Sequence, residues 1–204
     1  MSFYNDVIFP RLCHLVMQNR QLIPYRERVV SSAEGRVLEI GIGSGLNLPF
    51  YRSNVREIVG VDPAPQLIAI ARQLAGRLPM PVTFLEESAE TISLDDNTID
   101  TIVTTWTMCS VPQVGRVLAE MRRVLKPSGR MLLVEHGLAP EVRVQRWQNR
   151  LTPAWKRVSG GCHLNRPIRT MIEDAGFSFD RLETSYRPGP KPWAFIYEGS
   201  ARLH

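Results

Sequence analysis

A glycine-rich segment after an apolar run is the strongest chemical signal in the sequence. The run contains Glu39 and passes directly into Gly41, Gly43 and Gly45. Glycines at this spacing let the backbone turn sharply and approach a bound ligand closely. A dinucleotide-binding fingerprint would need its third glycine where Leu46 stands. The segment therefore indicates a ligand-binding turn and disfavours a nicotinamide cofactor.

A second acidic residue follows the next apolar run. Asp62 directly follows the run 57–61, which is the next predicted strand after the glycines. A carboxylate at this place can accept hydrogen bonds from both hydroxyls of a ribose. Alone, a glycine-rich turn is often an ordinary loop, and an Asp before a proline is often a helix cap. Together, at the ends of two predicted strands, they predict a nucleoside site.

Alternating apolar runs and amphipathic segments must position these residues. The sequence predicts strands at 36–40, 57–61, 82–86, 99–105 and 130–135, with helices at 47–52, 66–77 and 114–125. Strands separated by helices imply a parallel sheet with helices on both faces. The expected fold class is therefore α/β.

The two ends of the chain follow different patterns. The N-terminal apolar residues recur at helical spacing and are interrupted at Pro10 and Pro24, which predicts a helical preface. After His136, helices are predicted around 141–151 and 167–175, followed by strands near 178–186 and 193–198. With 204 residues, the chain has room for one compact domain.

Composition and charge exclude several classes of protein. The chain is 44% hydrophobic and 22% charged, as is typical of a globular domain. Its net charge is +5, but the basic residues alternate with acids and are only mildly enriched at 143–169. This pattern favours a solvated basic face over a nucleic-acid site, while attraction to anionic substrates or lipid head groups stays open.

The cysteines and the N-terminus bear on the compartment. Cys13, Cys109 and Cys162 lack the paired spacing of a disulfide framework or a zinc site, so no metal is expected and a reducing compartment is predicted. No segment resembles a signal peptide or approaches the roughly 18 apolar residues of a membrane span. The expected location is cytoplasmic.

These segments resemble the motifs of the class I S-adenosylmethionine-dependent methyltransferases. Glu39–Gly45 resembles the first motif, Val59–Asp62 the second and LKPSGRMLLVEH (125–136) a later one, and the resemblance covers about 35–200. It implies one Rossmann-like domain with a seven-stranded sheet, six strands parallel and one reversed. It also implies S-adenosyl-L-methionine as cofactor and S-adenosyl-L-homocysteine as product.

The resemblance also implies cofactor contacts. Gly41, Gly43 and Gly45, which follow Glu39, are expected to line the methionine and ribose moieties. Asp62 is expected to hold the ribose, and the residue after it to lie against the adenine; that residue is Pro63.

Adenine recognition departs from the family pattern. Many members have an acidic residue after the third strand, where this chain has Ser88 beside Ala89. We therefore expect Ser88 and backbone groups to contact the adenine. Glu90 is either a further ligand residue or a helix-start charge.

The end of the fourth strand is where cofactor and acceptor should meet. Thr105 and Trp106 are the candidates for the edge of the methyl-transfer site, and Trp106 either packs against the sulfonium or belongs to the core. Cys109 is expected to be a buried apolar residue, because methyl transfer needs no protein nucleophile.

Two histidines are candidate bases for an acceptor with a removable proton. His136 directly follows the fifth strand, and His163 lies beside a glycine pair. The alternative for His136 is a structural histidine, and Glu135 either orients it or caps the turn. Four further residues either contribute to the acceptor and cofactor pockets or have packing and surface roles: Tyr4, Trp155, Cys162 and Arg166.

A narrower resemblance concerns the acceptor. TMCSV (107–111), EH (135–136) and PAWKRVSGGCHL (153–164) are similar to the membrane-associated thiol methyltransferases of animals and their soluble bacterial relatives, in the methyltransferase type 11 branch. This implies a small-molecule acceptor and suggests a thiol. The alternatives are phospholipid or amine N-methylation and non-catalytic binding of the cofactor or its product. The animal proteins' apolar anchor has no counterpart here, so their membrane attachment is not carried over.

Taken together, the expected organisation is a single methyltransferase domain over residues 1–204. Its parts are a helical preface at 1–34, a cofactor-binding core at 35–136, an acceptor-side insertion at 137–166 and a closing helix with strands at 167–204. No nucleic-acid partner is expected, and the oligomeric state is not predicted.

Overall fold

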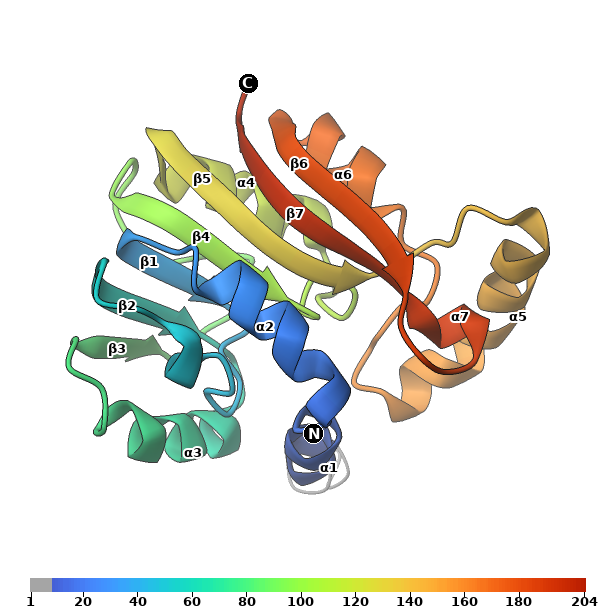
Figure 1. Cartoon of the computed structure of the whole chain (residues 1–204), viewed down its shortest axis with the longest axis horizontal. Helices are drawn as coiled ribbons and strands as arrows, with labels where there is room; N and C mark the ends of the chain where they lie inside the picture. Colours follow the sequence, from blue (N-terminus) through green and yellow to red (C-terminus); the bar gives the residue numbers. More distant parts are fainter. Residues whose placement is uncertain (1–8) are drawn as a thin grey trace.

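A seven-stranded sheet forms the centre of the molecule in a computed structural model that describes residues 9–204 (Figure 1). The strand order is β3-β2-β1-β4-β5-β7-β6. The first five strands pair in parallel, and β7 runs antiparallel to both neighbours. The bounds are β1 Gly35–Ile40, β2 Val55–Val61, β3 Val82–Leu85, β4 Ile99–Thr105, β5 Leu125–His136, β6 Phe177–Tyr186 and β7 Phe195–Leu203. The prediction of six parallel strands and one reversed strand is confirmed.

Helices cover both faces of the sheet, as predicted. The α-helices are α1 Phe9–Met17, α2 Ile23–Val30, α3 Pro65–Ala75, α4 Val114–Val124, α5 Val142–Val158, α6 Ile168–Asp174 and α7 Lys191–Ala194. One apolar core lies between α2 and the sheet, and a second lies between the opposite face and helices α4 and α6. The central strands β1, β2 and β4 are buried from both sides, which explains their nearly continuous apolar sequences.

The strand order reverses between β1 and β4, and this reversal positions the site. The crossovers from β1 and from β4 leave toward opposite sides, so their carboxyl ends separate and leave a crevice. Glu39 in β1, Asp62 after β2 and Thr105 at the end of β4 all lie at this edge.

Three local predictions are wrong in their details. Residues 47–52 form only a short 3-10 helix, Leu48–Phe50, because the glycine turn still occupies the preceding positions. The helix expected to end near 151 continues through Pro153 to Val158. Trp193 belongs to α7 and precedes the last strand, and its ring packs edge-on against Trp155 at 5.8 Å between centroids. This contact joins α7 to α5, and both lie to one side of the sheet in Figure 1.

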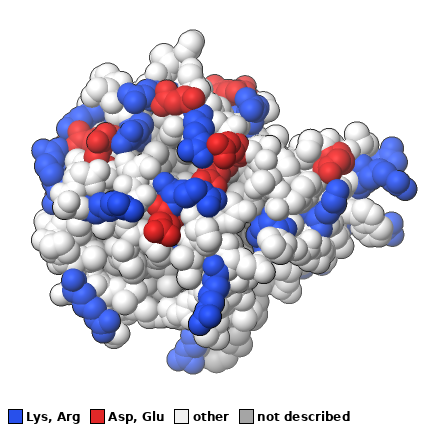
Figure 2. All heavy atoms as spheres, viewed as in Figure 1, with Lys and Arg blue, Asp and Glu red and all other residues white. Residues whose placement is uncertain are grey.

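Charge on the surface agrees with the sequence pattern. Figure 2 shows Lys and Arg alternating with Asp and Glu over the upper part of the main body, while basic residues predominate on the part formed by α5 and α7. Among residues 9–204, no helix is both long and apolar enough to cross a membrane.

Candidate active site

A cavity of about 430 Å³ opens at the carboxyl ends of β1, β2 and β4. Helix α1 and the turns after these strands form its walls. Most of the residues expected to contact the cofactor or acceptor line it: Glu39, Gly41, Gly43, Asp62, Pro63, Ser88, Ala89, Thr105 and Trp106. The fold therefore gathers segments far apart in the sequence into one site of ligand size.

Glu39 carries a carboxyl group that is held in a buried hydrogen-bond network. Its Oε1 accepts from Asn47 Nδ2 at 2.8 Å, and its Oε2 accepts from the Tyr51 hydroxyl at 2.7 Å. Arg26 Nη1 donates to Asn47 Oδ1 at 2.7 Å, which fixes the amide orientation. Burial raises the pKa of Glu39 to about 7, although the bonds from Tyr51 and Asn47 act in the opposite direction. Near neutral pH this carboxyl group is therefore poised between its two protonation states.

The glycine turn after β1 needs left-handed backbone at three positions. The φ angles of Gly41, Gly43 and Gly45 are 70°, 53° and 76°. A Cβ on Gly41 would lie 2.3 Å from Thr107 Oγ1, whereas a Cβ on Gly43 would meet nothing closer than 3.9 Å. Gly43 thus leaves open space at the cavity wall, where a ligand can approach the backbone.

Gly45 has a different role from the one expected. It is absent from the cavity lining, and a Cβ there would lie 2.8 Å from Leu48 and 3.1 Å from Ala71 of α3. Gly45 was expected to line the ligand, but the structure gives it no place in the cavity wall. Gly45 instead allows the turn to pack closely against α3.

Asp62 joins two of the strand-end turns. Its Oδ2 accepts from the Gly43 N–H at 3.0 Å, and its Oδ1 accepts from the Ala64 N–H at 2.9 Å. Burial raises the pKa of Asp62, while these two backbone bonds lower it. Its carboxylate combines the predicted cap-like bond with a place in the cavity wall.

Ser88 and Thr105 present hydroxyl groups at the cavity from different sides. Ser88 Oγ accepts from the Glu90 N–H at 3.2 Å, and Thr105 Oγ1 accepts from Asn47 Nδ2 at 3.0 Å. Glu90 Oε1 accepts from the Gln113 N–H at 2.9 Å and does not line the cavity. Of the two roles considered for Glu90, the structure therefore favours a structural one.

Trp106 lies in the cavity wall with one face occupied by a cation. The Arg26 guanidinium carbon lies 4.8 Å from the centre of its ring, and Tyr25 packs edge-on at 6.4 Å. Burial lowers the pKa of Arg26 to about 10, so the group stays cationic at neutral pH. Trp106 also has a φ of 52°, which is unusual for a bulky residue. The cation that packs against this face of the Trp106 ring is therefore the Arg26 side chain.

Glu135 fixes the turn after β4 and does not orient His136. Its Oε1 accepts from Thr104 Oγ1 at 2.9 Å and from the N–H groups of Thr107 and Met108 at 2.9 and 3.1 Å. Of the two roles considered, capping the turn is the one the structure shows. This fully buried carboxyl group holds the segment that carries Thr105 and Trp106.

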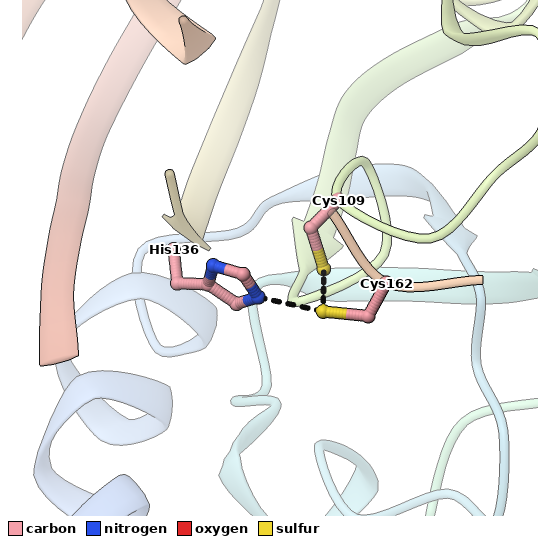
Figure 3. A group of neighbouring side chains, drawn as sticks. All are labelled: Cys109, His136 and Cys162. Atoms are coloured by element: carbon pink, nitrogen blue, oxygen red, sulfur yellow. Dashed lines mark hydrogen bonds between the residues drawn. The ribbon is translucent and has the colours of Figure 1, made fainter. Parts of the chain in front are cut away.

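His136 contacts the sulfur of Cys162 and does not line the cavity. Figure 3 shows His136 and Cys162 pointing toward one another with Cys109 alongside. His136 Nε2 lies 2.8 Å from Cys162 Sγ, which lies 3.7 Å from Cys109 Sγ. The neighbouring Cys109 thiol and His136 lower the pKa of Cys162. Burial acts to lower the pKa of His136, but the hydrogen bond to Cys162 and the negative charge of the Cys162 thiolate raise it, and the net shift of the pKa is upward.

Two of the three cysteines lie close together, which their spacing in the sequence did not indicate. Cys109 follows β4 and Cys162 follows α5, so their separation of 53 residues gave no signal of a pair. Both adjoin residues of the cavity wall, because Ser110 and Gly161 line it. The cluster therefore lies directly behind that wall.

His163 and Arg166 hold the segment after β4 in place. The N–H of His163 donates to the Cys109 carbonyl at 2.8 Å, and its Nδ1 lies 3.2 Å from the same oxygen. Arg166 is buried and donates to the carbonyl oxygens of Met108 and Val111. Neither side chain lines the cavity, so the structure does not bring the candidate base His163 to the site, and of the two roles considered for Arg166 it favours packing.

Helix α1 covers the cavity. The apolar pattern predicted the helix but did not indicate which of its residues face the cavity. Cys13, His14 and Met17 line the cavity, and His14 Nδ1 lies 2.8 Å from Ser44 Oγ in the glycine turn. Tyr4, the candidate for closing over the cofactor, lies outside the described residues.

The sheet with one reversed strand, the glycine turn and the acidic strand ends define a nucleoside-binding α/β enzyme domain. A family model described as a methyltransferase domain matches residues 38–133. The thiol S-methyltransferase TMT1B of Rattus norvegicus is 35% identical over 167 residues, which cover 80% of this chain and 67% of that protein.

Two further comparisons agree at the level of the family. The phosphatidylethanolamine N-methyltransferase of Cereibacter sphaeroides is 36% identical over 109 residues, which cover 52% of this chain and 53% of that protein. The crystal structure of an S-adenosylmethionine-dependent methyltransferase from Methanosarcina mazei matches with a TM-score of 0.66 at 22% identity, over 82% of this chain and 92% of that one. The chain belongs to the S-adenosylmethionine-dependent methyltransferases, and S-adenosylmethionine is its cofactor.

Proposed function

We propose that this methyltransferase transfers the methyl group to the sulfur of a small thiol. The observation that carries the proposal is the 35% identity to a thiol S-methyltransferase over 80% of the chain. The fold and cavity alone suit many acceptors, so the choice of a thiol depends on this relative.

The cavity residues fit the cofactor. Gly41 and Gly43 would hold it against the turn, Asp62 would accept from the ribose hydroxyls, and Pro63 would lie against the adenine. Ser88, Ala89 and Thr105 would complete the cavity walls beside the cofactor. Glu39 would lie beneath the glycine turn, and Gly45 would contribute by letting that turn pack against α3. Open space at Gly43 and second lone pairs on the Asp62 oxygens support this assignment.

The bound cofactor supplies an electrophilic methyl group on a sulfonium. Methyl transfer is an in-line displacement, so the protein must align the acceptor, exclude water and favour the thiolate. A thiol has a pKa near 8.5 in water, so a modest stabilisation of its thiolate is enough. Trp106 and α1 would exclude water, because both cover the cavity.

The two histidines lie outside the cavity lining and would act on the site through the residues that they hold. His136 would support the acceptor side through the cluster with Cys162, and His163 would position the segment after β4. The acceptor side would be built from the preface 1–34 and the insertion 137–166, of which Gly160 and Gly161 line the cavity. We propose that all parts form one domain that functions in the cytoplasm.

N-methylation of a phospholipid or amine is the second candidate. The observation that favours it is the 36% identity to a phosphatidylethanolamine N-methyltransferase, although the match covers only 52% of the chain. Separate reactions with small thiols, small amines and phosphatidylethanolamine vesicles discriminate the two candidates by mass spectrometry. Methylated amine or lipid without methylated thiol would contradict the proposal.

A variant at His136 tests the acceptor side separately. His136→Ala is expected to lower turnover with a thiol by more than tenfold while cofactor affinity changes less than threefold, as roughly expected for a group that supports the acceptor side of the site and not the cofactor side. His204→Ala is the matched control, because the His204 side chain bonds to Ser178 and lies outside the cavity and the sulfur cluster. Equal turnover of His136→Ala and the control across pH would make His136 structural.

A further inference from the structure

Three potential metal ligands converge from separate parts of the chain. Cys109 lies after β4, His136 ends β5 and Cys162 follows α5 (Figure 3). Their two sulfurs and the imidazole nitrogen all lie within 4.8 Å of one another. No other role assigned above uses all three groups, and the spacing in sequence gave no indication of them.

The separation of the two sulfurs suits a tetrahedral ion. With Zn–S bonds of about 2.3 Å and Zn–N bonds of about 2.0 Å, neighbouring sulfurs lie about 3.8 Å apart and a sulfur and nitrogen about 3.6 Å apart. The two sulfurs are already 3.7 Å apart. His136 Nε2 lies 2.8 Å from Cys162 Sγ. The imidazole would therefore have to move outward by about 1 Å, a shift available to a half-buried side chain.

The backbone around the ligands is held independently of any ion. The His163 N–H donates to the Cys109 carbonyl at 2.8 Å, and the buried Arg166 donates to the carbonyls of Met108 and Val111. These bonds clamp the segment after α5 to the segment after β4. The two cysteines are thus brought together by contacts that do not involve their sulfurs.

We infer that Cys109, His136 and Cys162 form a binding site for one thiophilic divalent cation of the Zn²⁺ class. Thiolate and imidazole ligands favour such ions over Mg²⁺ or Ca²⁺, which prefer oxygen. Two thiolates balance the charge of the ion. Three protein ligands leave the fourth tetrahedral position open, as in catalytic zinc sites.

A role for the open position follows if the acceptor is a thiol, and this step depends on the proposed function. Ser110 and Gly161, the chain neighbours of the two cysteines, line the cavity, so the ion would lie close to it. An acceptor thiol would bind at the fourth position: its S–H bond breaks, the proton passes to solvent, and a sulfur electron pair forms the bond to the ion. The ion would thereby hold the acceptor as a thiolate at neutral pH.

A disulfide between the two cysteines is the competing interpretation. It would require the sulfurs to move from 3.7 Å to a bond of about 2.05 Å. It would also leave His136 without its observed sulfur partner. The observed separation and the third ligand both favour the ion.

Cobalt titration of the tag-free, reduced full chain tests the site without relying on activity. One equivalent of Co²⁺ is expected to produce thiolate-to-cobalt charge-transfer absorption, which Zn²⁺ then displaces. Cys109→Ser and Cys162→Ser should each weaken binding on the order of 100-fold or more. His204→Gln is the matched control that should retain it, since His204 lies outside the cluster and outside the cavity. Circular dichroism and cofactor affinity establish that each variant is folded.

Several outcomes would overturn the inference. These are absence of the absorption, its persistence in folded Cys162→Ser, or formation of a Cys109–Cys162 disulfide by a protein that binds no Co²⁺ when reduced. A change in the absorption on adding an acceptor thiol supports the open-position role. An unchanged spectrum alongside methylated thiol product contradicts that role. If the ion binds but no thiol is ever methylated, the proposed function fails while the metal site stands.

Discussion

The Asp62 carboxylate accepts a hydrogen bond from the Gly43 N–H at 3.0 Å. The side chain that ends β2 therefore holds the turn that follows β1. Its second oxygen accepts from Ala64 at 2.9 Å, at the start of α3. One buried carboxylate thus links three elements at the mouth of the cavity, which makes the shape of the turn and the charge of the site depend on the same residue.

Replacing Asp62 should weaken cofactor binding. Asp62→Ala removes the acceptor proposed for the ribose hydroxyls, and a hydrogen bond to a charged group contributes about 1.5–3 kcal/mol, which is roughly 10- to 100-fold in affinity. Calorimetric titration with S-adenosylmethionine measures the change. Asp180→Ala is the control, because Asp180 is exposed and pairs with Arg202 far from the cavity. Unchanged affinity in Asp62→Ala would remove the ribose assignment.

Two glycine variants should separate packing from ligand approach. Gly41→Ala places a Cβ 2.3 Å from Thr107 Oγ1 at a φ of 70°. It should lower the free energy of unfolding by about 3 kcal/mol through overlap and left-handed strain.

Gly43→Ala has the same strain but no close protein atom. It should cost only about 1 kcal/mol of stability, yet lower cofactor affinity more than tenfold because its Cβ enters the space beside the ligand. Urea unfolding and calorimetry on both variants give the comparison. Equal loss of stability in the two variants would contradict the packing account.

The Glu39 carboxyl group should make stability depend on pH in the absence of cofactor. Its pKa is about 7 in the folded protein against an ordinary value of 4.5, so the folded state binds the proton more tightly than the unfolded state. The contribution of Glu39 to stability is therefore full below pH 4.5 and is lost as pH rises through 7.

Glu39→Gln removes this dependence. Between pH 5 and pH 8, the free energy of unfolding of the natural protein should fall by about 2.5 kcal/mol relative to the variant. Unfolding titrations at both pH values measure the difference between the two slopes. Parallel pH profiles would show that the carboxylate is not destabilised by its burial.

Helix α1 should depend on the glycine turn for its position. His14 Nδ1 lies 2.8 Å from Ser44 Oγ, and this hydrogen bond links α1 to that turn. His14→Ala should therefore speed hydrogen exchange of the α1 amides, and cofactor binding to the natural protein should slow it. Gln18→Ala is the control, since Gln18 contacts His14 from the exposed side. Equal exchange of α1 with and without cofactor would place the helix outside the binding event.

The sequence predicted the features that depend on neighbouring residues. Buried parallel strands have continuous apolar runs, and Asp62 could be placed because it directly follows one of them. Glu135 could not be assigned a partner, because its bonds go to the Thr104 hydroxyl and to two backbone N–H groups after β4, all 27 to 31 residues earlier.

Contacts between distant segments were the main omissions. Cys109 and Cys162 are brought together by the clamp from Arg166 to the segment after β4, and no periodicity marks such a contact. The continuation of α5 through Pro153 was missed for a related reason. Proline usually ends a helix, but packing of Trp155 against Trp193 favours helix beyond it.

The transfer of a methyl group to a thiol is the central claim, and mass spectrometry of reaction products tests it most directly. The natural protein, S-adenosylmethionine and matched panels of small thiols, small amines and phosphatidylethanolamine vesicles are incubated in separate reactions, with Asp62→Ala as the binding-impaired control. The account predicts methylated thiol, formed with an equal amount of S-adenosylhomocysteine and much reduced in Asp62→Ala. Methylated amine or lipid with no methylated thiol would contradict it.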